Sequence, residues 1–119
     1  MGALRRFLDR LTESDEARLA AEIHEWADSV AGSVRIAEAP IRERVKIAGI
    51  IRRMTVLPMK DNESLDAHVS DGTGEVVVRF MGRRAIDGLG SGTKVVVEGV
   101  LGEQHGVMQT MNPRLELTA

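Results

Sequence analysis

The chain of 119 residues has no cysteine, no tyrosine, one tryptophan and two phenylalanines. Without cysteine it forms no disulfide bond of its own and no thiolate metal site. No apolar run approaches the ~20 residues that a membrane-spanning helix needs. Asp9 and Arg10 follow Arg5 and Arg6 too closely for a secretory signal. We therefore expect a cytoplasmic protein that neither crosses nor binds a membrane.

An excess of positive charge is also missing. The formal net charge is -2 and the pI is about 5.9. A protein that binds nucleic acid through its overall charge is basic, so a site for a polyanion in this chain would have to come from local clustering of Arg and Lys.

The first forty residues have the apolar periodicity of amphipathic helices. We predict one or two helices over residues 3–11 and 14–31, ending before Gly32, within a helical N-terminal extension of residues 1–40. The apolar positions recur three or four residues apart, at Leu4, Phe7, Leu8, Leu11, Leu19, Ile23, Trp26 and Val30.

Beyond Pro40 the apolar period changes to two, and β-branched residues become frequent. We predict turns at residues 58–64, 71–74 and 102–106, and a short helix over 83–89. The alternation predicts five strands, at residues 45–52, 65–69, 76–81, 94–99 and about 107–117.

Five strands with a short helix between the third and fourth describe a small Greek-key barrel, the OB-fold. Gly49 lies midway in the long first strand, where such a barrel needs a sharp bend. An SH3-like barrel is the competing architecture, and the predicted helix argues against it. The expected fold class is therefore α+β, with a five-stranded OB-fold barrel over residues 41–119 after the helical extension.

Five segments carry a resemblance to a known family. Four of them, Val45–Ile51, Leu65–Gly74, Val76–Met81 and Gly92–Gly99, resemble the anticodon-binding type of nucleic-acid-binding OB-fold domain. Met111–Glu116 is similar to the final strand of the barrel that forms the wedge of RecG-type branch-migration helicases. The resemblance implies single-stranded or branched DNA, or RNA, as a partner.

The alternation that turns Phe80 inward turns Arg79 outward. In an OB-fold the outer face of strands two and three is where oligonucleotides lie, and arginine there can bind phosphate and stack on bases. The alternative is a solvated face whose cations are offset by nearby Asp and Glu. The candidate nucleic-acid-binding residues are Lys46, Arg52, Arg53, Lys60, His68, Arg79, Arg83 and Arg84.

Aromatic stacking platforms are scarce, because Phe7, Trp26 and Phe80 all occupy positions expected to pack in a core or interface. His68, Met81 and arginine planes remain as stacking partners, which predicts modest, salt-sensitive affinity.

Signs of catalysis are absent from the pattern. Residues 88–94 hold a glycine-rich run that leads into a strand, whereas a phosphate loop leads into a helix. His24, His68 and His105 are isolated in the sequence, so we expect no metal, no cofactor and no enzymatic activity.

The sequence therefore predicts a non-catalytic nucleic-acid-binding domain. The alternative is a protein-interaction adaptor or self-associating module that uses the barrel and the N-terminal amphipathic helices, with a protein partner or a second copy bound through residues 3–31. Those helices have three possible locations: the open end of the barrel, a second copy, or another partner.

Overall fold

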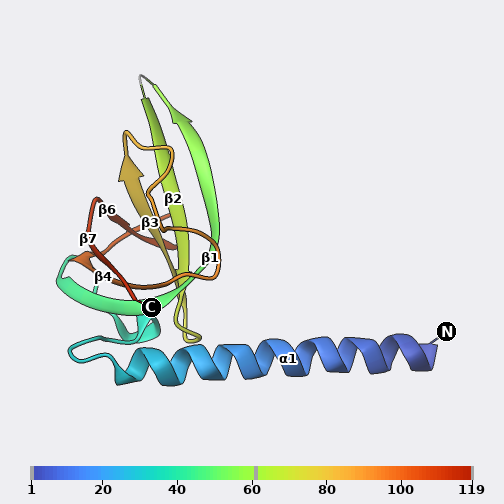
Figure 1. Cartoon of the computed structure of the whole chain (residues 1–119). Coiled ribbons are helices and arrows are strands. Elements are labelled where there is room, and N and C mark those ends of the chain that lie inside the picture. Colours follow the sequence, from blue (N-terminus) through green and yellow to red (C-terminus); the bar gives the residue numbers. More distant parts are fainter. Residues whose placement is uncertain (1, 61, 119) are drawn as a thin grey trace.

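The computed structural model describes residues 2–60 and 62–118, without the side chains of residues 7–14 and 59. It contains a long helix, a 3-10 turn and one seven-stranded sheet (Figure 1). The projecting helix makes the molecule elongated, with extents of 52 × 34 × 31 Å. The elements are α1 (Gly2–Ser29), η1 (Ile36–Glu38), β1 (Arg44–Met59), β2 (Asn62–Ser70), β3 (Glu75–Met81), β4 (Lys94–Val100), β5 (Gly102–Gln104), β6 (Val107–Met111) and β7 (Arg114–Leu117).

The strands are hydrogen-bonded in the order β5-β6-β3-β2-β1-β4-β7. β3 and β6 are parallel, and the other pairs are antiparallel. The ladder of hydrogen bonds is open, with β5 and β7 at its edges. Only Asn112 and Pro113 separate β6 from β7, although β6 pairs with β3 and β7 pairs with β4. The chain therefore brings the two ends of the sheet together, and the sheet curls around its core.

β1 has 16 residues and belongs to two ladders. Its first part pairs with β4 and its second part with β2, and Ile50 takes part in both pairings. A Cβ on Gly49 would lie 2.7 Å from the carbonyl oxygen of Ser70, so only glycine fits this close approach. A bulge follows directly, where the register shifts between Ile51 and Arg53. The predicted bend in the first strand is confirmed.

The apolar core lies inside the curled sheet. Ile47, Val69, Val78 and Phe80 are all buried there, as the alternation predicts. Ile36 also belongs to this core, although it comes from the predicted N-terminal extension.

The buried carboxylate of Asp71 secures this contribution from the N-terminal extension. Its Oδ2 accepts a hydrogen bond from the backbone N–H of Ile36 at 2.8 Å, and its Oδ1 accepts one from the N–H of Thr73 at 2.8 Å. A single side chain thus fixes both the β2–β3 turn and the start of η1.

Helix α1 is continuous and packs on the sheet only through its C-terminal part. Ala27 contacts Ala48 and Val96 on the outer face of β1 and β4. Trp26 lies at the same interface, with the Lys94 Nζ 5.1 Å from its ring centroid. The helix thus covers the outside of the sheet rather than an open barrel end, and its N-terminal part projects beyond it (Figure 1).

Part of the predicted apolar stripe on α1 is therefore not buried. Leu4 is 67% exposed and Leu19 is 46% exposed. The predicted stripe positions Phe7, Leu8 and Leu11 lie outside the described side chains. Within the described part of the chain, no helix is both long and apolar enough to cross a membrane.

Three predictions of secondary structure are wrong. Residues 83–89 form turns instead of a helix, since Gly82 and Gly88 adopt positive φ angles of 75° and 82° that interrupt helical geometry. Residues 58–64 are largely strand, because β1 and β2 continue as a long hairpin. The predicted last strand is divided into β6 and β7, where Asn112 has a φ of 47° and Pro113 lacks an N–H donor.

We predict that Gly49→Ala lowers the free energy of unfolding by about 1–3 kcal/mol, because the added methyl group forces β1 away from β2. Urea unfolding measures this. Gly90→Ala is the matched control, since a Cβ there has nothing within 4 Å; it should change stability by less than about 0.5 kcal/mol. Equal stabilities of the two variants would contradict the packing argument.

Candidate functional site

The outer face of β1, β2, β3 and β6 is organised in rows of side chains that the strand register aligns. Phe80 is buried in the core and Arg79, its neighbour in β3, lies on this outer face, as the alternation predicts. The rows run as Arg53, His68, Val77 and Gln109, then Thr55, Asp66, Arg79 and Met111, then Leu57, Ser64 and Met81.

Arg79 forms a two-point ion pair with Asp66, its cross-strand partner. Its Nε lies 3.0 Å from Asp66 Oδ1, and its Nη2 lies 3.0 Å from Asp66 Oδ2. The Asp66 side chain is only 4% exposed and that of Arg79 is 22% exposed. The hydrogen-bonded carboxylate stabilises the cation and raises the pKa of Arg79 above its ordinary value. The predicted cation is therefore on the expected face, but a buried carboxylate offsets its charge.

Two more candidates have acidic partners. Arg84 Nε lies 2.9 Å from Glu63 Oε2. Glu63 alternates with Ser64 along β2, so this pair lies on the side opposite Arg79. His68 Nδ1 lies 3.5 Å from Glu75 Oε1 on the outer face. Among the described residues, five candidates have no carboxylate at ion-pair distance: Lys46, Arg52, Arg53, Lys60 and Arg83.

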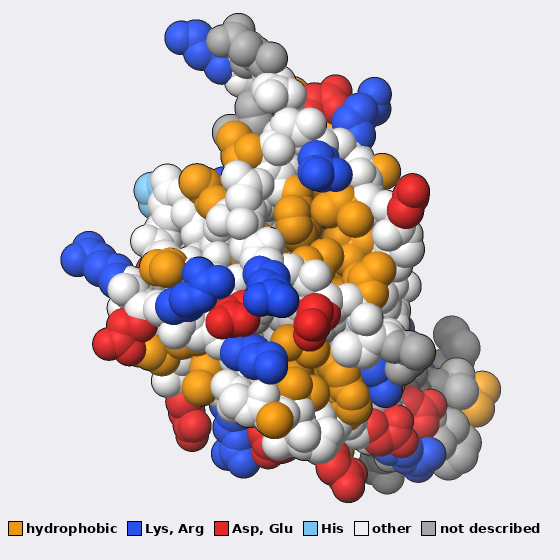
Figure 2. Space-filling model, turned by 60° about the vertical axis from the view of Figure 1, so that its left-hand side comes forward, with side chains coloured by type: hydrophobic (Ala, Val, Ile, Leu, Met, Phe, Trp, Pro, Cys, Tyr) orange, Lys and Arg blue, Asp and Glu red, His pale blue; other side chains and the backbone are white. Residues whose placement is uncertain are grey.

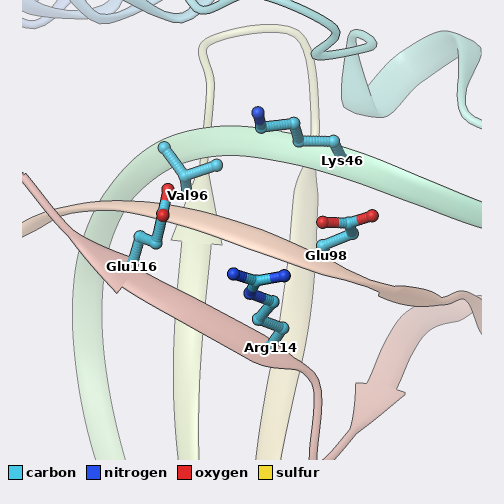
Figure 3. Close-up of a pocket in the computed structure, with 5 residues that line it drawn as sticks. All are labelled: Lys46, Val96, Glu98, Arg114 and Glu116. Carbon is cyan, nitrogen blue, oxygen red and sulfur yellow. The ribbon is translucent and has the colours of Figure 1, made fainter.

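Lys46 belongs to a different surface, formed by β1, β4 and β7. It lines a cavity of about 150 Å³ with Val96, Glu98, Arg114 and Glu116 (Figure 3). Arg114 lies between the two glutamates in this view. Two cations and two carboxylates leave this surface without an excess of positive charge, so it is a poor site for a polyanion.

The outer face holds a groove of about 370 Å³ beside the hairpin of β5 and β6. Residues of β1, β2 and β3 line one part of it, and residues of the β5–β6 hairpin line the rest. Its lining residues are Arg53, His68, Glu75, Val77, Gly106, Val107 and Met108.

Two residues that line this groove, Val107 and Met108, were not predicted as site residues. They reach the groove because β6 pairs in parallel with β3, and no short-range pattern discloses a pairing between segments so distant in the chain. The nearest signal is the turn predicted at 102–106, which reaches this position as the β5–β6 hairpin.

The groove combines two kinds of surface. Val77, Val107 and Met108 supply apolar contact, and Arg53 supplies a cation without an acidic partner among the described residues. Glu75 also lines the groove, so the charges there are mixed. On the face drawn in Figure 2, Lys and Arg are interspersed with Asp and Glu between two hydrophobic areas. Apolar side chains with a few polar groups among them are the usual lining of a ligand site.

Comparison with known proteins supports the fold. No protein family in the scan matches the chain, and no curated protein matches it. Among solved structures, it is similar to a chain of a replication protein A heterotrimer bound to single-stranded DNA, with a TM-score of 0.51 and 14% sequence identity. The match covers 76% of this chain and 68% of the other. At this identity the likeness concerns the fold, which is that of OB-fold proteins.

We predict that Arg79→Ala lowers the free energy of unfolding by about 2–4 kcal/mol, because it leaves the buried Asp66 carboxylate without its cation. Thermal and urea unfolding measure this. Arg84→Ala, the matched control, removes an exposed pair and should cost less than about 1 kcal/mol. A loss at Arg79 no larger than the loss at Arg84 would show that the Asp66 pair is not structural.

Proposed function

We propose that this chain is an OB-fold domain that binds single-stranded nucleic acid, without catalysis, in the groove between β2, β3 and the β5–β6 hairpin. In this proposal the five barrel strands are β1, β2, β3, β4 and the divided strand β6–β7 in Greek-key order. The β5 strand is an addition to the connection that follows β4. The N-terminal helix braces the opposite outer face.

The main support for this proposal is the position of the groove on the sheet. OB-folds bind oligonucleotides on the face of their second and third strands, between the loops that follow strands one and four. Here Arg53, His68 and Val77 contribute that face, and the β5–β6 hairpin occupies the place of the loop after strand four. The structural neighbour described as bound to single-stranded DNA is consistent with the same use of the fold.

The charge distribution supports a modest, salt-dependent affinity. Arg53 lines the groove, Arg52 lies at the adjacent bulge, and Lys60 lies in the turn of the long β1–β2 hairpin. In the proposal, Arg53 contacts a phosphate in the groove, and Arg52 and Lys60 add positive charge along β1 and at the end of its hairpin. The net charge of -2 means that little attraction comes from the rest of the molecule.

DNA and RNA offer the same phosphates and base faces to this groove, so the proposal covers both. Branched DNA, which the resemblance to RecG-type barrels also implies, would present its single-stranded parts. The alternative function, an adaptor that binds through α1, is favoured by the exposed Leu4 and Leu19 on the projecting helix. It predicts no affinity for an oligonucleotide, so one binding experiment separates the two.

We predict micromolar or tighter binding of a labelled oligo-dT at low salt, measured by fluorescence anisotropy over a salt series. The affinity should fall linearly with salt on logarithmic axes, because binding releases counterions. Arg53→Gln should weaken binding about three- to tenfold and reduce the salt slope by about 0.7, the contribution of one phosphate contact on a single strand.

Arg114→Gln is the matched control, since it makes the same charge change on the surface of β4 and β7. It should leave both the affinity and the slope nearly unchanged. An absence of binding at low salt would overturn the proposed function. Equal losses in the two variants would overturn its placement in this groove.

A further inference from the structure

We propose that Arg79, held flat by Asp66, is a stacking platform for an unpaired base. This inference rests on the proposed function and names what the outer face recognises, namely the bases of a single strand in addition to its phosphates.

The two-point contact fixes the plane of the guanidinium group. A single hydrogen bond would leave the side chain free to rotate, whereas contacts of 3.0 Å to both oxygens of Asp66 hold the planar group in one orientation. Asp66 is itself immobile, because it is buried and its Oδ1 accepts a hydrogen bond from Ser64 Oγ at 3.4 Å. Arg79 therefore needs little ordering when a ligand arrives, which favours binding.

The ion pair also changes what Arg79 offers to a ligand. With two of its five N–H donors engaged by a carboxylate and its charge offset, the guanidinium attracts phosphate less strongly than a free arginine does. A guanidinium face is weakly hydrated and suited to stacking on an aromatic ring. The Arg79 side chain as a whole is 22% exposed, so part of it is accessible from solvent.

The surroundings of Arg79 suit a base. The Met111 and Met81 side chains flank it and are 55% and 37% exposed, and Val77 lies in the neighbouring row beside the groove. The described Trp and Phe rings are elsewhere, Trp26 against the sheet under α1 and Phe80 in the core, and the His68 imidazole lies in the neighbouring row beside the groove. Arg79 thus supplies a fixed planar group in the place where other OB-folds use aromatic residues.

The test compares two ligands of equal length and charge, oligo-dT and an oligomer of abasic nucleotides. We expect the wild-type chain to bind oligo-dT about tenfold more tightly, since stacking adds affinity for each base. Arg79→Lys keeps the charge and removes the plane. It should abolish this preference while leaving the affinity for the abasic oligomer within about twofold.

Arg84→Lys is the matched control, because Arg84 pairs with Glu63 on the side of β2 opposite Arg79. This variant should keep the full preference for oligo-dT. Asp66→Asn is the second variant, because it keeps the size of the side chain and loses the charged two-point contact. It should reduce the preference even where Arg79→Lys folds poorly, and circular dichroism melts establish which variants are folded.

Equal binding of the two oligomers by the wild-type chain would overturn the inference and leave the proposed function standing. If the preference for oligo-dT persists in both the Arg79→Lys and the Asp66→Asn variants, the inference is overturned and the proposed function stands. If the wild-type chain binds neither oligomer at low salt, both the proposed function and the inference are overturned.

Discussion

The structure depends on the way in which β1 serves two ladders. A strand that pairs with β4 along its first part and with β2 along its second has to coil strongly at the change of partner. Gly49 allows the close approach to Ser70 at that point, and the bulge between Ile51 and Arg53 restores the register beyond it. Without this bend the sheet could not curl, and β6 and β7 could not reach β3 and β4 through a connection as short as Asn112 and Pro113.

The same bend separates the outer surface into two parts with different uses. Before it, Ala48 faces α1, and the neighbouring Lys46 lies among balanced charges. After it, Arg53 faces the groove and begins the rows that contain Arg79. Because the bulge adds one residue to β1, Arg53 lines the groove and the preceding Arg52 does not. The helix therefore packs over β1 and β4, whereas the proposed ligand lies over β2, β3 and the β5–β6 hairpin.

The sequence predicted the features that depend on local alternation. The inward positions of Val78 and Phe80 and the outward position of Arg79 follow from a period of two and are confirmed. The predicted helix at 83–89 is wrong because Gly82, directly before it, and Gly88, within it, adopt positive φ angles that apolar periodicity does not reveal. The coarse α+β arrangement was therefore predictable, and the division of the last strand at Pro113 was not.

The candidate site was predictable only in part, because partners across the sheet decide what a side chain can do. The sequence indicated Arg79 and Arg84 as candidate cations and left open whether nearby acids offset them. Asp66 lies opposite Arg79 in the β2–β3 ladder, and Glu63 pairs with Arg84. Lys46 alternates correctly for the outer face, but it lies before the bend and so on the other surface. Val107 and Met108 reach the groove through a parallel pairing that connects distant segments.

The most direct test of this account is a map of the bound surface. The amide resonances of the isotopically labelled full chain would be followed by NMR during titration with oligo-dT at low salt. The account predicts that the largest changes occur at Arg53, His68, Val77, Arg79, Val107 and Met108. Changes concentrated instead around Lys46, Glu98 and Arg114, or along α1, would contradict it.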